Sequence, residues 1–180
     1  MHRILILLLV ATGCSALKVT PELSPREAYA ARYVAMARAE MKRSGVPASI
    51  TLAQGMLESG NGTSRLAVKG RNHFGIKCHK GWEGRTIYED DDREHECFRR
   101  YRSVRESYRD HSDFLRTRKR YSALFELEPD DYQGWAQGLQ KAGYATNPKY
   151  AERLTALIEA ENLQRFDRGA KRFARARVSR

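Results

Sequence analysis

The sequence predicts a mostly helical α+β domain with one short β segment near its middle. Two observations carry this prediction. Apolar residues recur at helical spacing, behind recognisable helix caps, on both sides of the middle of the chain. Between Asn72 and Tyr101 this pattern gives way to short β-prone runs separated by glycines and acidic residues. The chain has 180 residues, 41% of them hydrophobic, which suits one folded domain rather than a disordered segment.

Two helices are expected before residue 60. The first starts at Ser24-Pro25-Arg26-Glu27, which combines a capping residue, a proline at the first position and a capping-box acid. It ends at Ser44-Gly45-Val46-Pro47, and the second runs over about 48–58 until Gly60-Asn61-Gly62 stops it. The residues expected to face the core from these two helices are Tyr29, Tyr33, Met36, Ala37, Ile50, Ala53, Met56 and Leu57.

The β segment and three more helices follow. Three β-prone runs, 74–78, 85–88 and 96–101, predict a small antiparallel sheet. Ser103 with Glu106 forms a capping box, Asp130 or Asp131 can cap the next helix, and Asn147-Pro148 starts the last. The inward faces of these helices are expected to carry Val104, Tyr108, Leu115, Trp135, Leu139, Tyr150, Leu154, Leu157 and Ile158.

The charge balance predicts an anionic partner. Lys and Arg number 33 against 22 acidic residues, which gives a formal charge of +11 and a pI near 9.8. The composition excludes a collagen, a coiled coil and a multi-pass membrane protein, but not an enzyme. Residues 164–180 are interpreted as a basic tail, which either holds the protein on a polyanion or is simply solvated.

The N-terminus predicts export. Residues 1–16 place an arginine before a continuous apolar run too short to span a bilayer, followed by small residues, as in a bacterial signal peptide. Ala11-Thr12-Gly13-Cys14 is similar to a lipobox, in which Cys14 would carry the lipid. Cleavage after Ala16 is the alternative. We therefore expect an exported protein in the periplasm or cell envelope, with a lipid anchor preferred over a soluble mature chain.

Export leaves two cysteines in an oxidising compartment. Cys78 and Cys97 are expected to form a disulfide, which would close a loop of about 19 residues and stabilise the fold by about 3 kcal/mol. A zinc site that adds His79 and His95 is the alternative, although the ligand spacings are shorter than structural zinc sites use.

Glu58 is the strongest candidate for chemistry. It ends the second predicted helix, with apolar residues before it and two glycines soon after. Partial burial raises a carboxyl pKa, because the charged form loses solvation, and so keeps a proton ready for a leaving oxygen. From position at a helix end alone, an ordinary surface residue would be the favoured interpretation.

A run of motifs around Glu58 resembles a known family. The segment Ala53-Gln54-Gly55-Met56-Leu57-Glu58-Ser59-Gly60-Asn61-Gly62 is similar to the signature of glycoside hydrolase family 73, the bacterial peptidoglycan N-acetylglucosaminidases of flagellar rod hydrolases and autolysins. The similarity continues, in the order of the family, through Asn72-His73-Phe74-Gly75-Ile76-Lys77, Phe98-Arg99-Arg100-Tyr101, and residues 142–151. It covers about 44–162 and implies a lysozyme-like fold, a helical lobe and a small β-hairpin lobe with a glycan groove between them, over a domain of residues 24–163.

The resemblance also implies site residues. Glu58 would be the general acid and Tyr144 a groove tyrosine that positions the sugar. A second carboxylate is expected on the β lobe. Its candidates are Glu89, Asp90, Asp91 and Asp92, with Glu89 and then Asp90 preferred and Glu83 and Glu94 less favoured. Phe74 and Gly75 are expected to shape the floor of the groove near the N-acetyl group. Asn72 and Asn147 are expected to orient either the backbone or the sugar, and Trp82 either to stack on a sugar ring or to act only as a lid.

The function implied is hydrolysis of the β-1,4 bond on the reducing side of N-acetylglucosamine in peptidoglycan by a monomer, with no cofactor or metal. A non-catalytic glycan-binding domain is the alternative from another class, and a muramidase or lytic transglycosylase is the enzymatic one. A nucleic-acid partner rests on charge alone and is not expected.

Overall fold

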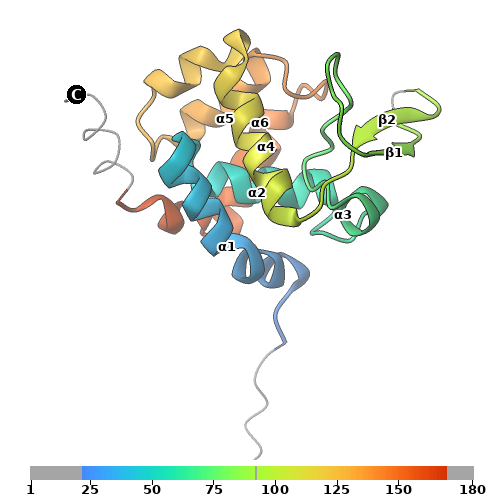
Figure 1. The fold of residues 1–180 in the computed structure, drawn as a ribbon. Coiled ribbons are helices and arrows are strands. Elements are labelled where there is room, and N and C mark those ends of the chain that lie inside the picture. The colour runs from blue at the N-terminus through green and yellow to red at the C-terminus, as the bar shows by residue number, and fades with distance from the viewer. Residues whose placement is uncertain (1–21, 92, 170–180) are drawn as a thin grey trace, which may run out of the picture.

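The computed structural model describes residues 22–91 and 93–169, and within these ranges a helical lobe adjoins a small β lobe (Figure 1). The predicted signal peptide, Cys14 and most of the basic tail lie outside the described residues. The elements, in chain order, are α1 (Pro25–Ser44), α2 (Ala48–Ser59), α3 (Arg65–Gly70), β1 (Thr86–Glu89), β2 (Glu96–Arg99), α4 (Val104–Thr117), the 3-10 helix η1 (Lys119–Glu126), α5 (Tyr132–Lys141), α6 (Tyr150–Ala160) and the 3-10 helix η2 (Leu163–Asp167).

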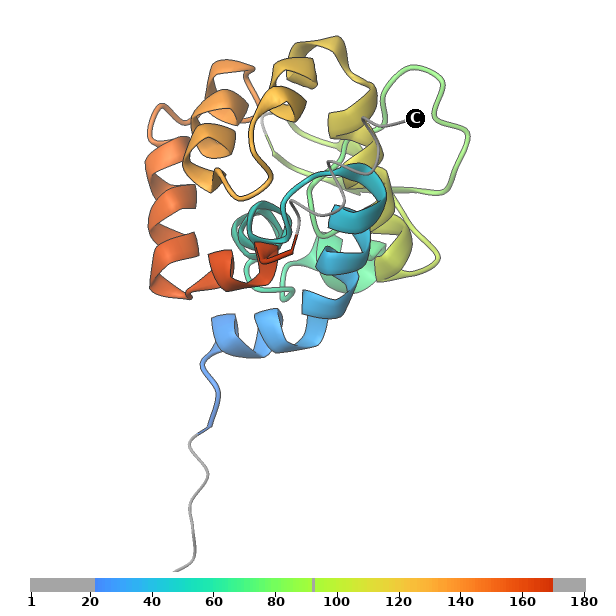
Figure 2. The same ribbon diagram turned by 90° about the vertical axis from the view of Figure 1, so that its left-hand side faces the viewer.

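Helix α2 is the centre of the helical lobe. It packs against α1, α5, α6 and η2, and Figure 2 shows it nearly end-on among these elements. Every residue from Ala48 to Met56 is buried, so α2 is enclosed on all sides rather than half-exposed. The helix therefore holds whatever follows Met56 in a fixed position relative to the whole lobe.

Helix α1 begins where its caps predict. The Ser24 hydroxyl accepts a hydrogen bond from the Glu27 backbone N–H at 3.2 Å, and the Glu27 carboxylate accepts one from Ser24 N–H at 2.8 Å. This reciprocal pair satisfies two backbone donors that a helix start leaves open. Tyr29, Tyr33 and Ala37 are buried as predicted, while Met36 is only partly buried.

The β lobe is a two-stranded hairpin beside α3. Strands β1 and β2 are antiparallel, with Ile87 opposite Phe98 and Tyr88 opposite Cys97. The predicted third strand over 74–78 is wrong, because only Lys77 bridges to Phe98 there. Gly75 has φ +58°, a left-handed conformation that turns the chain out of an extended path.

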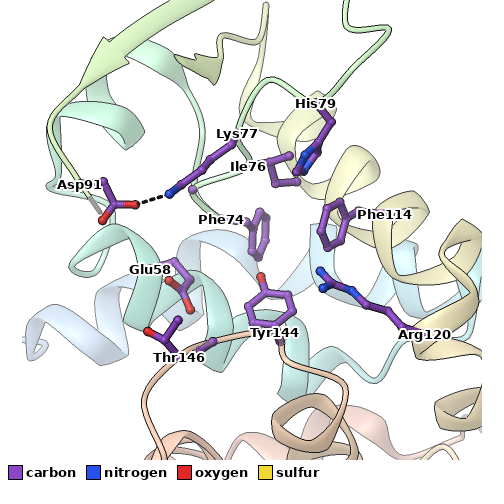
Figure 3. A pocket seen from close by; sticks show the side chains of 12 residues that line it. Glu58, Phe74, Ile76, Lys77, His79, Asp91, Phe114, Arg120, Tyr144 and Thr146 are labelled. Carbon is purple, nitrogen blue, oxygen red and sulfur yellow. Dashed lines mark ion pairs between the residues drawn. The ribbon is translucent and has the colours of Figure 1, made fainter. Parts of the chain in front are cut away.

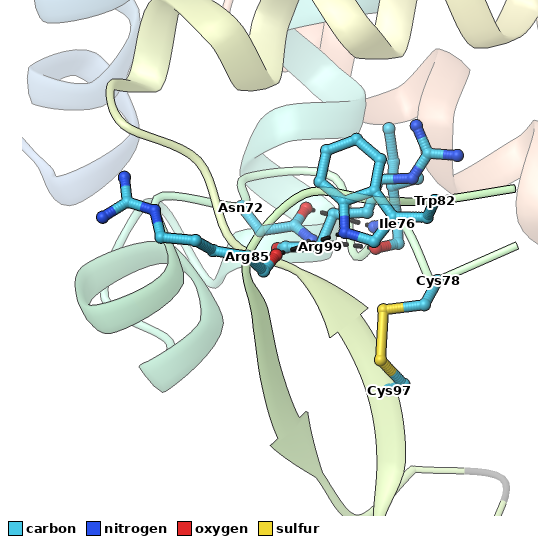
Figure 4. The surroundings of a disulfide bond; sticks show 7 residues. All are labelled: Asn72, Ile76, Cys78, Trp82, Arg85, Cys97 and Arg99. Atoms are coloured by element: carbon cyan, nitrogen blue, oxygen red, sulfur yellow. Dashed lines mark hydrogen bonds between the residues drawn. A yellow bond between two sulfur atoms is a disulfide. The ribbon is translucent and has the colours of Figure 1, made fainter.

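A disulfide joins Cys78 to Cys97, as expected from the sequence (Figure 4). The Cα atoms are 5.3 Å apart, and the Cys78 N–H donates to the Cys97 carbonyl at 2.8 Å. The bond ties the segment after Ile76 to β2. Both sulfurs are used in this bond, so the zinc alternative, which needs two free thiolates, is wrong.

The C-terminal part of the domain extends further than expected. Leu163 is fully buried, and the Asp167 carboxylate accepts a hydrogen bond from the Ser49 N–H, at the start of α2, at 2.9 Å. The boundary expected after residue 163 therefore falls inside η2. Within the described ranges, no helix is both long and apolar enough to cross a membrane.

Gly55 lies in the middle of α2, where helix propensity alone would favour alanine. A Cβ at this position would collide with the hydroxyl of Tyr29. That hydroxyl is held by hydrogen bonds to the Tyr108 hydroxyl and to His73 Nδ1, each 2.9 Å long. Gly55→Ala should therefore destabilise the fold by about 1–3 kcal/mol, the usual range for overpacking, instead of stabilising it by up to about 1 kcal/mol. Urea denaturation of both proteins measures the difference.

The control for Gly55→Ala is a double-mutant cycle with Tyr29→Phe. Removing the hydroxyl creates the space that the new methyl group needs, so the alanine should cost less in the Tyr29→Phe background. Equal costs in the two backgrounds would contradict the proposed collision.

Candidate active site

A pocket of about 350 Å³ opens where the helical lobe meets the β lobe (Figure 3). Its walls come from the end of α2, the segment after Asn72, the β1–β2 connection, α4, η1 and the loop before α6. The lining residues are Glu58, Phe74, Gly75, Ile76, Lys77, His79, Asp91, Phe114, Arg120, Tyr144, Ala145 and Thr146. Three of the predicted site residues outside the acidic cluster, Phe74, Gly75 and Tyr144, thus lie together with Glu58.

Glu58 reaches the pocket because α2 stops one residue later. Gly60 is left-handed at φ +57°, and its N–H donates to the Met56 carbonyl, which closes the helix. The Ser59 hydroxyl donates to the Gly55 carbonyl and accepts from the Gly62 N–H at 2.7 Å. These contacts hold the turn rigidly, so the Glu58 side chain points from a fixed helix end into the pocket.

The pKa of Glu58 is raised to about 7. Burial is the largest cause, because it removes water from the charged form, and the nearby Asp91 carboxylate raises the pKa further. The positive charge of Arg153 and a hydrogen bond with Tyr150 act in the opposite direction. Near neutral pH a substantial fraction of Glu58 is therefore protonated, as a general acid requires.

A chain of buried polar side chains connects Glu58 to α4. His111 and Gln54 are linked between Nε2 and Oε1 at 3.0 Å, and Gln54 Nε2 donates to the Tyr150 hydroxyl at 2.9 Å. The Tyr150 hydroxyl hydrogen-bonds in turn to Glu58. Burial lowers the pKa of His111 to about 3, so the ring is neutral and its Nε2–H can donate. The chain orients the Tyr150 O–H toward Glu58.

Tyr144 and Phe74 form the inner wall of the pocket. The Tyr144 ring is stacked on Tyr150, with centroids 5.6 Å apart, and Phe74 is stacked on His111 at 4.0 Å. Burial, followed by the charges of neighbouring groups including Glu58, raises the pKa of the Tyr144 hydroxyl. The hydroxyl is therefore a neutral hydrogen-bond donor in the working pH range.

The preferred second carboxylates lie elsewhere. Glu89, at the end of β1, pairs with Arg65 of α3. Asp90 accepts a hydrogen bond from the His95 backbone N–H at 2.8 Å, which closes the hairpin turn. Among the described acidic residues of this turn, Asp91 is the one that lines the pocket. Asp92 lies outside the described residues.

Asp91 is held by a lysine that sequence analysis did not single out. Lys77 Nζ is 3.0 Å from the Asp91 carboxylate and 2.7 Å from that of Glu96 on β2. Figure 3 shows Asp91 and Lys77 above Glu58, on the β-lobe side of the pocket. Lys77 could have been chosen from the sequence, because it ends the family-like segment Asn72–Lys77. Nothing in the sequence indicates that it pairs with Asp91.

Asn72 organises the pocket without facing it. Its side chain is 1% exposed, and its amide nitrogen donates to the carbonyls of Ile76 and Arg99 at 3.0 and 2.9 Å (Figure 4). Its oxygen accepts from the Phe74 and Ile76 N–H groups at 3.4 and 3.1 Å. All four hydrogen bonds of the Asn72 amide go to the backbone, so Asn72 orients the backbone around the pocket rather than the sugar.

Trp82 and Asn147 also lie outside the pocket lining. The Arg99 guanidinium lies 4.4 Å from the Trp82 ring centroid, and the indole N–H donates to the Arg85 carbonyl at 3.2 Å, beside a separate hollow. Asn147 Oδ1 accepts a hydrogen bond from the Lys149 backbone N–H at 2.8 Å, in the turn that precedes α6. Neither residue is brought to Glu58.

The raised pKa of Glu58 predicts a pH-dependent gain in stability for Glu58→Gln. The folded state keeps its proton up to about pH 7, whereas the unfolded chain releases it near 4.5, so the wild-type protein loses stability as pH rises between these values. The variant escapes this loss, which amounts to at most about 3 kcal/mol at pH 8. Thermal unfolding at pH 5 and pH 8 measures the difference.

The control for this stability measurement is Glu94→Gln, an exposed acid of the hairpin outside the pocket lining. It changes the net charge equally and should show no comparable gain at pH 8. The same melting-temperature difference for both variants would mean that general charge, rather than burial of Glu58, controls the effect.

Comparisons with known proteins support the resemblance described above. A family model described as mannosyl-glycoprotein endo-beta-N-acetylglucosaminidase matches residues 34–163. The exo-glucosaminidase LytG of Bacillus subtilis is 32% identical over 161 residues, which cover 83% of this chain and 56% of the relative. Peptidoglycan hydrolase FlgJ of Salmonella typhimurium is 36% identical over 143 residues, covering 73% and 45%. The chain thus spans about half the length of these curated relatives.

Solved structures confirm the expected lysozyme-like fold. The catalytic domain of the autolysin Auto from Listeria monocytogenes matches with a TM-score of 0.70 at 25% identity, covering 83% of this chain and 91% of that one. The glycoside hydrolase domain of Salmonella typhimurium FlgJ matches with a TM-score of 0.65 at 30% identity, covering 86% and 98%. The chain belongs to the glucosaminidase family, glycoside hydrolase family 73.

Proposed function

We propose that this chain is an exported peptidoglycan hydrolase that cleaves the β-1,4 bond between N-acetylglucosamine and N-acetylmuramic acid. The observation that carries the proposal is Glu58, a half-buried carboxyl with a pKa of about 7 in a pocket between two lobes. Glycosidic oxygen is a poor leaving group unless it is protonated as the bond breaks. Glu58 supplies this proton, and the departing sugar leaves as a neutral alcohol.

Asp91 is assigned the role of the second carboxylate. Glycoside hydrolysis pairs a general acid with a carboxylate that activates water or stabilises the positively charged sugar ring. Asp91 lines the same pocket as Glu58 and raises its pKa, which supports this assignment over Glu89 and Asp90. Lys77 pairs with Asp91 and orients its carboxylate.

Tyr144 and Tyr150 are assigned supporting roles. The Tyr144 hydroxyl lies in the wall of the pocket and is available to donate to the N-acetyl group or a sugar hydroxyl. Tyr150 donates to Glu58 and so stabilises the carboxylate that remains after proton transfer. The Gln54 and His111 chain keeps Tyr150 in the donating orientation.

Export supports the choice of substrate, because peptidoglycan lies outside the cytoplasm. The proposal rests on the signal-like residues 1–16 and on the Cys78–Cys97 disulfide, which is typical of proteins in oxidising compartments. A lipid on Cys14 would keep the hydrolase at the membrane surface, within reach of the cell wall.

The experiment that tests this function is digestion of purified peptidoglycan followed by mass spectrometry of the released fragments. The proposal predicts N-acetylglucosamine at each new reducing end. N-acetylmuramic acid there would identify a muramidase, and an anhydro ring would identify a lytic transglycosylase. Binding without any release of fragments would favour the non-catalytic glycan-binding alternative.

A further inference from the structure

The side of the pocket away from Glu58 carries a cluster of cationic and aromatic side chains, called here the cationic corner and defined as His79, Arg118 and Arg120. Figure 3 shows His79, Phe114 and Arg120 on this side, with Phe74 and Tyr144 between them and Glu58. The Arg118 guanidinium lies 4.1 Å from the centroid of the Phe114 ring, and His79 stacks on the same ring at 5.7 Å. His79 and Arg120 line the pocket, and Arg118 lies against Phe114, which lines it as well.

The arginines of this corner differ from the neighbouring cations in the described part of the chain, because they have no carboxylate partner there. Neighbouring cations have carboxylate partners: Lys77 pairs with Asp91 and Glu96, and Arg99 pairs with Asp110 at 2.8 Å. Within the described ranges, no carboxylate pairs with Arg118 or Arg120. The pKa of His79 is lowered by burial and then by the charges of Arg118, Arg99 and Arg120, against an opposing effect of Asp110. The corner therefore has a net positive potential.

Aromatic rings hold both guanidiniums in place before any ligand arrives. Arg118 lies over Phe114, and the Arg120 guanidinium lies 4.7 Å from the Tyr121 centroid. A guanidinium stacked on a ring keeps its in-plane N–H donors for a second partner, and carboxylates match that planar geometry. The corner is therefore arranged for a carboxylate more than for a neutral sugar.

Arg120 also marks the boundary with a second hollow. This hollow has a volume of about 670 Å³. Its apolar side chains are Ala123, Leu124, Leu127 and Ala142, and α5 adds two glycines together with Gln137 and Lys141. Arg120 lines both the pocket and the hollow. A side branch of the glycan that passes the cationic corner would therefore extend into this hollow. Its apolar side chains suit a short peptide rich in alanine better than another sugar.

We propose that Arg118 and Arg120 bind a carboxylate carried by the muramic acid side of the substrate. This inference rests on the proposed function and adds to it a basis for choosing peptidoglycan over uncharged glycans. Two parts of peptidoglycan could supply this carboxylate. A stem peptide carries free carboxylates at its side chains and C-terminus, and a muramic acid that has lost its stem exposes the carboxylate of its lactyl group.

The test measures binding, so that its result does not depend on turnover. The full-length protein carrying Glu58→Gln is titrated by calorimetry with three tetrasaccharides: stem-bearing peptidoglycan fragments, the same fragments after amidase removal of the stems, and chitotetraose, which has no carboxylate. The double variant Arg118→Gln/Arg120→Gln should weaken binding of at least one of the two carboxylate-bearing ligands by about 10-fold or more. Chitotetraose binding should change by less than about twofold, and added salt should diminish the difference.

Lys119→Gln is the matched control. It removes one positive charge from between the two arginines, but Lys119 is exposed and lines neither the pocket nor the hollow, so binding should be unchanged. A loss confined to the stem-bearing ligand identifies the stem as the source, and one confined to the amidase-treated ligand identifies the lactyl group. Equal losses for all three ligands, or none for either carboxylate ligand, overturn the proposal while leaving the proposed function intact. Absence of binding by any ligand before the arginines are changed overturns both.

His79 offers a second readout within the same samples. A bound carboxylate offsets the charges of Arg118, Arg120 and Arg99, so the pKa of His79 should rise when the ligand saturates the protein. Proton NMR of the ring follows this titration, with chitotetraose as the uncharged comparison. An unchanged pKa in the presence of the stem-bearing and the amidase-treated ligands would contradict a carboxylate at this corner.

Discussion

Glu58→Gln is expected to reduce peptidoglycan cleavage by about 10⁴-fold, the upper end of the range for general acid catalysis. The amide has the shape and hydrogen-bonding capacity of the acid but no transferable proton. Because a sugar alkoxide is a poor leaving group, little of the rate should survive without that proton. Release of soluble fragments from purified sacculi measures the effect.

Binding supplies the control for Glu58→Gln. The variant should retain nearly the wild-type affinity for a glycan fragment, because Tyr150 and the pocket wall are unchanged. A loss of affinity as large as the loss of rate would indicate a disrupted pocket rather than a missing proton. More than a tenth of wild-type cleavage, with N-acetylglucosamine still at the new reducing end, would show that Glu58 is not the acid.

Asp91→Asn is expected to reduce turnover by about 10²-fold or more, because it removes the carboxylate that lines the pocket together with Glu58. The same fragment-release assay applies. Glu89→Gln and Asp90→Asn are matched controls from the same turn, since Glu89 pairs with Arg65 and Asp90 with the His95 N–H. Both should stay within a few-fold of wild type. Full activity of Asp91→Asn beside a large loss in either control would contradict the assignment.

Asp91→Asn should also change the pH dependence of the activity that remains. The charge of Asp91 contributes to the raised pKa of Glu58, so its removal should lower that pKa. The loss of activity on the alkaline side should therefore begin at lower pH in the variant. This shift separates an electrostatic contact between the two carboxyls from a purely structural role of Asp91.

The helices that carry their own end signals could be predicted from the sequence. The Ser24–Glu27 box starts α1, and Gly60 ends α2 one residue after the predicted limit. Helix α3 and the 3-10 helix η1 were not predicted, because each is short and depends on tertiary packing rather than on helical periodicity. The run 74–78 looked like a strand from its composition, but the bonds of Asn72 and the left-handed Gly75 make it a turn.

Some residues of the candidate site could likewise be predicted from the sequence and others could not. Glu58 could be found because its position at the end of α2 and its surrounding motif both lie within one local segment. Choosing among four adjacent acids requires the geometry of the hairpin turn, in which Asp90 bonds back to His95 and Asp91 reaches the pocket. Arg120 and Phe114 were not predicted, because only the packing of α4 and η1 brings them opposite Glu58.

The protonation of Glu58 at working pH is the central claim, and one experiment measures it together with its consequence. The protein labelled with ¹³C at glutamate carboxyls is titrated by NMR, with Glu58→Gln to identify the signal, and kcat/KM is measured over the same pH range. The account predicts a Glu58 pKa of about 7 and an alkaline loss of kcat/KM at the same pH. A Glu58 carboxyl that titrates near 4.5, with activity persisting well above that pH, would contradict it.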